Sequence, residues 1–197
     1  MPEAQEAILS APPFEKHLLH YGRDFLKELI VRAEGSYFFT EAGRAILDFS
    51  SGQMCATIGH NHPKIVEALA KAGQTVIHLD STMLSPDVIS LVDTLADLLP
   101  HQLSKVQLLN TGGEANESAL RLAKIATGRF EIIGMAGSWH GTTTGAASTT
   151  YAHGRKKYGP VMPGSLAIPS PNCYRCPIRH CADQCDMTCL DVGFEMI

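Results

Sequence analysis

An apolar run, two adjacent glycines and a helix-forming stretch follow one another in residues 108–117. Gly112 and Gly113 have no Cβ, so their backbone N–H groups can approach an anion closely, and Thr111 adds a hydroxyl donor. The positive end of the following helix dipole also favours negative charge. The segment fits neither the dinucleotide motif G-x-G-x-x-G nor the P-loop G-x-x-x-x-G-K-[ST]. We therefore expect it to hold the phosphate of another small ligand.

The elements around this phosphate cup predict a βαβ unit. The run at 108–109 predicts a strand, the apolar spacing at 115–126 predicts a helix ending at Gly128, and residues 130–135 predict a second strand. The two strands are expected to be parallel, so that the loops after them open at one edge of the sheet. Trp139 follows the second strand, and a large flat ring beside the cup favours stacking on a flat cofactor.

Composition places the chain among soluble globular proteins. It has 197 residues, of which 45% are hydrophobic and 18% charged, and a net charge of -4 that argues against nucleic acid as a partner. No apolar run approaches the ~18 residues that span a membrane, and the acidic start does not resemble a leader, so we expect a cytoplasmic protein. The last residues have helical spacing without a cap, which predicts a fragment of a longer molecule.

The remaining pattern predicts two domains. Residues 1–62 are expected to form an N-terminal arm and hairpin segment, and residues 63–197 the first part of a larger α/β domain. The hairpin is predicted from the strand-like runs 36–40 and 44–49. Two helices are expected to begin near Pro63 and Ser85, and the alternation of strands and helices after Ser85 predicts a parallel sheet flanked by helices.

The sequence resembles the class III, or omega-aminotransferase-like, branch of the pyridoxal phosphate enzymes. The resemblance rests on Ile46–Phe49, Gly59–Pro63, Asn110–Glu117 and Trp139–Gly141. It implies the α/β PLP-dependent transferase fold type I, of which this chain would hold the N-terminal part, and it implies a homodimer. Within the branch, Ser51–Met54 and the tryptophan look most like 2,2-dialkylglycine decarboxylases.

The resemblance also implies roles for single residues. Thr111, Gly112 and Gly113 would hold the phosphate of pyridoxal 5'-phosphate, Asn116 would steady the cup, and Trp139 would stack on the pyridine ring. His140 would contact the phosphate or complete the turn, and both readings stand. Gln53, with Met54 beside it, would hold the substrate carboxylate.

Two reactions fit this set of residues. In the first, a 2,2-dialkylglycine loses CO2, leaves as a ketone, and the amino group passes to pyruvate. In the second, an ordinary class III aminotransferase passes the amino group of an amino acid or amine to a 2-oxo acid. Both need a Schiff-base lysine and an acidic partner for the pyridinium nitrogen, which family members keep further along the chain. The lysines present match no Schiff-base motif: Lys16, Lys27, Lys64, Lys71, Lys105, Lys124, Lys156 and Lys157.

Metal sites are predicted in two places. The resemblance places Leu79 and Ser81 where an alkali cation is bound through oxygen ligands. Cys173 and Cys176 form a C-x-x-C pair followed by Cys181, Cys185 and Cys189, and such thiolates suit zinc or an iron–sulfur cluster. The last three cysteines would equally well share one face of a helix and pack there without a metal. Two alternatives to an enzyme therefore stay open, a metal-binding module built on these cysteines and an inactive fragment.

Overall fold

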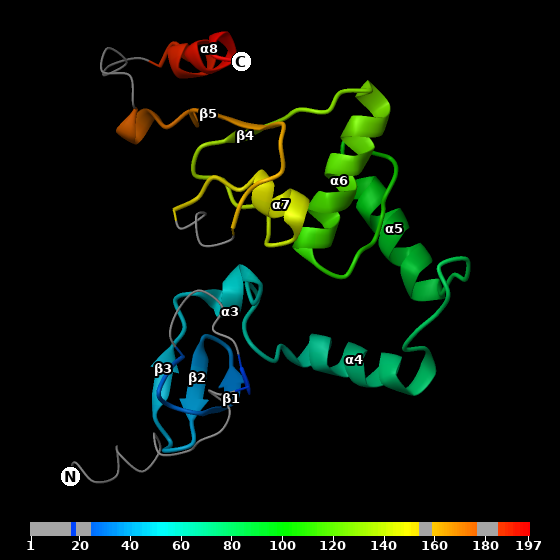
Figure 1. The fold of residues 1–197 in the computed structure, drawn as a ribbon. Coiled ribbons are helices and arrows are strands. Elements are labelled where there is room, and N and C mark those ends of the chain that lie inside the picture. The colour runs from blue at the N-terminus through cyan, green and yellow to red at the C-terminus, as the bar shows by residue number, and fades with distance from the viewer. Residues whose placement is uncertain (1–16, 19–24, 154–158, 177–184) are drawn as a thin grey trace, which may run out of the picture. The chain divides into compact units, whose positions relative to one another are not determined.

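A computed structural model describes residues 17–18, 25–153, 159–176 and 185–197 (Figure 1). The chain divides into two compact units, Met1–Leu91 and Val92–Ile197, and each is described by itself. The predicted domain boundary after residue 62 stays a prediction. Within the described ranges, no helix has both the length and the apolar character needed to cross a membrane.

The first unit contains a three-stranded antiparallel sheet in the order β1 (Ile30–Glu34), β2 (Tyr37–Thr40) and β3 (Ala45–Leu47). The predicted hairpin is confirmed as β2 paired with β3. Strand β1 was not predicted, because it lacks an alternation of apolar and polar residues. Four of its five side chains are exposed, and its pairing is irregular between Ile30 and Arg32.

Three helices follow the sheet: α3 (Ser51–Met54), α4 (Pro63–Thr75) and α5 (Pro86–Leu98), the last of which crosses the boundary between the units. The two longer helices are confirmed, and Pro63 opens α4 at its first turn, where its missing N–H costs nothing. The short α3 is distorted, because Gly52 and Gln53 have non-helical backbone angles.

The second unit holds the phosphate cup. Its elements are α6 (Gly112–Thr127), β4 (Ile132–Met135), α7 (Thr144–Ser148), β5 (Ser165–Ile168), the 3-10 turn η2 (Cys173–Arg175) and α8 (Thr188–Glu195). Helix α7 lies beside α6, and β4 lies beside β5 (Figure 1). The predicted end of α6 at Gly128 is confirmed, because this glycine caps the helix in the left-handed conformation with φ 67°.

The predicted parallel sheet is confirmed, but one predicted pairing is wrong. Strand β4 pairs in parallel with β5, Ile132 lying opposite Ser165 and Met135 opposite Ile168. The run at 108–109 was expected to form the other strand of the βαβ unit, yet the structure assigns no strand to 103–109 in the part of the chain that it describes. A strand needs a hydrogen-bonded neighbour, and the apolar character of the run does not supply one.

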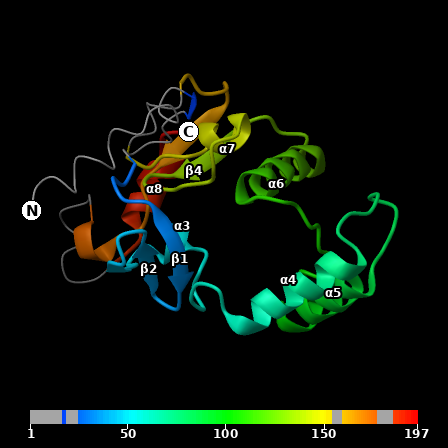
Figure 2. The same ribbon diagram turned by 90° about the horizontal axis from the view of Figure 1, so that it is seen from below.

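The core of the second unit is small and lies around β5 and α7. Among the residues that the structure describes in this unit, Ala146, Ile168 and Cys189 are the buried apolar ones. Helix α8 lies against β5 (Figure 2), and it approaches closely because Gly193 has no side chain: a Cβ there would lie 2.8 Å from the Cβ of Ile168. Thr150 is 1% exposed and uses its hydroxyl inside the unit, as described below.

Candidate cofactor site

Helix α6 begins with a reciprocal cap that determines which backbone N–H groups face a ligand. Thr111 Oγ1 accepts a hydrogen bond from the Glu114 N–H at 3.2 Å, and Glu114 Oε2 accepts from the N–H of Thr111 at 3.1 Å and of Asn110 at 3.0 Å. The next N–H groups belong to Gly112 and Gly113, in the first turn, where an α-helix provides no acceptor of its own. The cap uses the N–H groups of Asn110, Thr111 and Glu114, so the N–H groups of Gly112 and Gly113 are available to bind an anion.

The loop after β4 packs directly on this first turn of α6. Gly141 has a φ of 127°, and a Cβ added to it would lie 2.9 Å from Gly113 Cα. The two backbones can approach this closely because Gly141 has no side chain, whereas a Cβ at Gly113 would make only ordinary contacts with Thr143 and Thr111. The structure therefore brings the Trp139–Gly141 loop to the cup through Gly141.

Asn116 and Thr150 fix the backbone of His140 from two sides. Asn116 Nδ2 donates to the carbonyl oxygen of His140 at 2.7 Å, and the His140 N–H donates to Thr150 Oγ1 at 2.9 Å. Thr150 Oγ1 in turn donates to the carbonyl of Ala146 at 2.9 Å. Asn116 thus holds the loop against α6, while the role of the His140 side chain stays a prediction, since these bonds involve its backbone alone.

Glu117 ties α6 to α7, a role that the sequence did not reveal. Its Oε1 accepts the N–H of Gly145 at 2.6 Å and of Ala146 at 3.1 Å, which are the first-turn donors of α7. A hydrogen bond from the Thr143 hydroxyl and these backbone bonds hold the pKa of the Glu117 carboxyl below its ordinary value, against the opposing effect of burial. A charged Glu117 therefore serves as a remote cap for α7.

These residues fit a phosphorylated aromatic cofactor. The cup offers the Thr111 hydroxyl and glycine amides, and space is open beside Gly112, where an added Cβ would meet no atom within 4 Å. Trp139 is 46% exposed, so its indole does not lie in the interior of the unit. A flat ligand can therefore reach it, and stacking on the pyridine ring stays a prediction.

Four predicted site residues lie in the first unit. Gln53 and Met54 belong to the distorted α3, and both are exposed. Leu79 and Ser81 lie in the loop between α4 and α5. Because the two units are described separately, the substrate role of Gln53 and Met54 and the alkali-cation role of Leu79 and Ser81 stay predictions.

The cysteines form no complete metal site in the described part of the chain, where no three metal-ligating side chains gather. Cys181 lies outside the described residues. The shared helix face expected for Cys181, Cys185 and Cys189 is wrong, because Cys185 precedes α8 while Cys189 is buried within it. A side-chain hydrogen bond with Cys185 raises the pKa of the Cys173 thiol, and the predicted metal at Cys173 and Cys176 stays a prediction.

Comparisons with known proteins show the family of the chain. The family described as aminotransferase class III matches residues 21–192. An uncharacterized aminotransferase of Schizosaccharomyces pombe is 48% identical over 183 residues, which cover 92% of this chain and 41% of that protein. The chain thus spans about two fifths of the length of this relative.

Solved structures show the same relationship. An (S)-enantioselective omega-transaminase from Thermomicrobium roseum has a TM-score of 0.74 and 26% identity, over 85% of this chain and 39% of its own. A taurine:2-oxoglutarate aminotransferase from Bifidobacterium kashiwanohense, solved with PLP and glutamate, has a TM-score of 0.70 and 25% identity, over 86% and 38%. The α/β architecture is therefore part of PLP fold type I, and this chain belongs to the class III aminotransferases, a family that uses pyridoxal phosphate.

Proposed function

We propose that the full-length protein is a pyridoxal phosphate-dependent aminotransferase, which moves an amino group from an amino acid or amine to a 2-oxo acid. The observation that carries the proposal is the contact of the glycine turn of α6 with the Trp139–Gly141 loop in a class III chain. The relatives named above are aminotransferases, which favours amino transfer over decarboxylation.

Different residues of the chain would bind the phosphate and the ring of the cofactor. The N–H groups of Gly112 and Gly113 and the hydroxyl of Thr111 would hold the phosphate, and Trp139 would cover one face of the ring. Asn116 keeps the loop of Trp139 in place through its 2.7 Å hydrogen bond. When bound, the cofactor supplies the electron sink that lets a bond at the substrate Cα break.

Loss of CO2 from a 2,2-dialkylglycine is the second candidate. It is favoured by the resemblance of Ser51–Met54 and Trp139 to dialkylglycine decarboxylases. The amide of Gln53 can donate a hydrogen bond to a substrate carboxylate without an ion pair that would retain it. This candidate differs from the first only in which bond at Cα breaks.

One experiment separates the two candidates. The full-length protein is purified with pyridoxal phosphate, and its cofactor absorbance is followed while an ω-amino acid or 2-aminoisobutyrate is added, and then pyruvate or 2-oxoglutarate. We expect the ω-amino acid to change the spectrum, the 2-oxo acid to restore it, and no CO2 to form. Release of CO2 from 2-aminoisobutyrate would establish the second candidate. A protein with no cofactor spectrum would refute both, and metal analysis of that material would test the cysteine module.

A further inference from the structure

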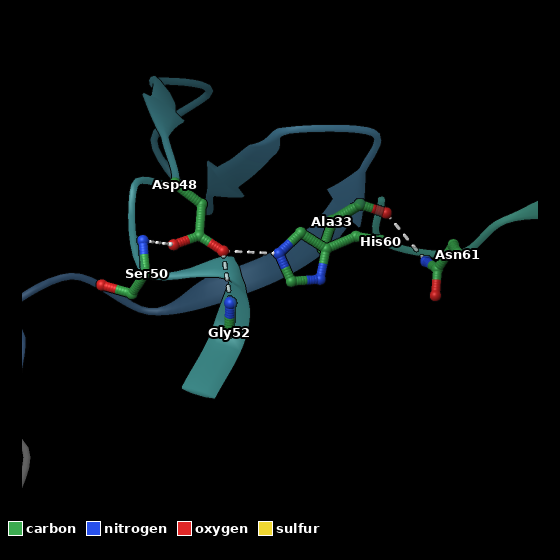
Figure 3. Close-up of polar contacts among 6 residues, drawn as sticks. All are labelled: Ala33, Asp48, Ser50, Gly52, His60 and Asn61. Atoms are coloured by element: carbon green, nitrogen blue, oxygen red, sulfur yellow. Dashed lines mark hydrogen bonds and ion pairs between the residues drawn. The ribbon is translucent and has the colours of Figure 1, made fainter. Parts of the chain in front are cut away.

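A nearly buried carboxylate and imidazole lie at the base of α3. Asp48 Oδ2 lies 2.7 Å from His60 Nε2, and the two side chains are 4% and 14% exposed. Asp48 Oδ1 also accepts the N–H of Ser50 at 2.8 Å, and its Oδ2 accepts the N–H of Gly52 at 2.6 Å (Figure 3). The hydrogen bond from His60 and those from the backbone hold the pKa of Asp48 below its ordinary value. An ionised carboxylate only accepts, so His60 Nε2 is the donor.

The turn that Asp48 binds has an unusual backbone. Ser51, Gly52 and Met54 have φ values of 53°, 67° and 61°. For residues with a Cβ this conformation is unfavourable and persists only where neighbouring contacts impose it. The Asp48 carboxylate provides such a contact in the middle of the turn, next to Gln53.

His60 is itself held to the sheet of the first unit. Its N–H donates to the Gly35 carbonyl at 2.8 Å, and its carbonyl accepts the Gly35 N–H at 3.1 Å. Its ring packs on Phe38 of β2, with centroids 4.5 Å apart. Gly59 permits this approach, because a Cβ there would lie 3.2 Å from Gly35 Cα. These contacts fix the His60 imidazole, and the hydrogen bond from its Nε2 in turn orients the Asp48 carboxylate.

We propose that Asp48 and His60 are a positioning pair, which holds the strained Ser51–Met54 turn so that the exposed Gln53 is presented to the carboxylate of the amino substrate. This inference rests on the proposed function. Both oxygens of Asp48 accept hydrogen bonds from within the unit, from the N–H groups of Ser50 and Gly52 and from His60, which is the arrangement a positioning role requires. A pocket of about 110 Å³ lined by Asp48, Ser51 and His60 gives the turn room to move once the pair is broken.

The first test measures the turn without reference to activity. Hydrogen exchange over residues 49–56 is compared in the full-length holoenzyme and in Asp48→Asn. We expect exchange at Ser50 and Gly52 to become about tenfold faster, because a neutral amide group is a weaker acceptor. Asp97→Asn, which removes an exposed charge in the last turn of α5, is the control and should change nothing there.

The second test measures the substrate. We expect Asp48→Asn to raise the KM of the amino donor about tenfold with little change in cofactor absorbance, since Gln53 would be misplaced while the phosphate cup is intact. His60→Gln keeps an N–H donor and should lie closer to the wild type than His60→Leu. In a Gln53→Ala background, Asp48→Asn should raise KM no further.

The outcomes separate the inference from the proposed function. Unchanged exchange in both Asp48→Asn and His60→Leu, or KM effects of Asp48→Asn and Gln53→Ala that multiply, would overturn the positioning pair while amino transfer stands. A KM that Gln53→Ala leaves at the wild-type value would overturn it too. A wild-type protein without cofactor spectrum or amino transfer refutes the proposed function directly. If Asp48→Asn does not accumulate, His60→Gln and His60→Leu give the same comparison.

Discussion

The bridge from Glu117 to α7 gives the sharpest quantitative prediction. Replacing Glu117 by Gln keeps an acceptor oxygen for the N–H groups of Gly145 and Ala146 but removes the charge. Replacing it by Ala removes the acceptor altogether. Because α7 follows the loop that packs on Gly113, both changes should loosen the cup as well as α7.

The expected magnitude follows from these hydrogen bonds. A bond to a charged group contributes about 1.5–3 kcal/mol and a neutral one about 0.5–1.5 kcal/mol, so Gln should cost on the order of 1 kcal/mol per bond. Glu117 is only partly buried, and solvent reduces the total for Glu117→Gln to about 1 kcal/mol, a factor of about five. Glu117→Ala should cost about 2 kcal/mol, comparable to the loss of a good N-cap, a factor of about thirty.

Amide hydrogen exchange at Gly145 and Ala146 is the direct assay, because it reports local opening. Exchange should be about fivefold faster in Glu117→Gln and about thirtyfold faster in Glu117→Ala. The folded-state pKa of Glu117 is lowered, so its contribution is complete above the unfolded-state value and is lost as pH falls through the folded-state one. The advantage of the wild type over Glu117→Gln should therefore vanish only below the ordinary range of a carboxyl group.

Two results would refute this reasoning. Equal exchange in the wild type and Glu117→Ala at neutral pH would show that the carboxylate does not hold α7. A difference between the wild type and Glu117→Gln that survives in strong acid would show that charge is not its cause. Lys105→Gln, which removes a charge from an exposed position before α6, is the control and should leave exchange at Gly145 unchanged.

Two further predictions concern glycines, each with a matched control. Gly141→Ala should weaken cofactor binding at least tenfold in an absorbance titration, because its Cβ would lie 2.9 Å from Gly113 Cα. Gly137→Ala is the control, since Gly137 also has a positive φ but a Cβ there would meet no atom within 4 Å. It should cost only about 1 kcal/mol of backbone strain. Equal losses in both variants would contradict the close packing of the cup. Gly193→Ala should lower the unfolding temperature, because its Cβ would lie 2.8 Å from the Cβ of Ile168 and would push α8 away from β5. Gly73→Ala in α4 is the control and should be neutral or stabilise the protein by up to about 1 kcal/mol. Similar melting curves for Gly193→Ala and the wild type would rule out that contact.

Sequence predicted best those elements whose signals are local. Pro63 opens α4 and Gly128 closes α6, and each acts through its own backbone preferences. The Thr111–Glu114 cap was not predicted, although its two residues are only three positions apart. The contact of the Trp139–Gly141 loop with the first turn of α6 was expected from a strand pairing that the described part of the chain does not contain, and it is made through Gly141.

The sequence predictions fail where a residue far away in the chain determines the local structure. Helix α7 has five residues, and its first-turn N–H groups bond to Glu117, which is 28 positions before Gly145. The sequence of α7 itself therefore does not indicate this contact. The run at 108–109 is apolar, as in a strand, but the apolar residues do not encode which strand they pair with. Asp48 and His60 stood inside the segments of family resemblance, yet only their 2.7 Å contact reveals a pair.

The ties that build the cup have a consequence for the order of folding. The hydrogen bonds from Asn116 to His140, from Gly145 to Glu117 and from His140 to Thr150 join residues only 24, 28 and 10 positions apart. Short loops close at a low entropic cost and quickly. We expect residues 116–150 to assemble early, while the ribosome is still synthesising the chain that follows them. The binding site for the cofactor phosphate would then form on the nascent polypeptide.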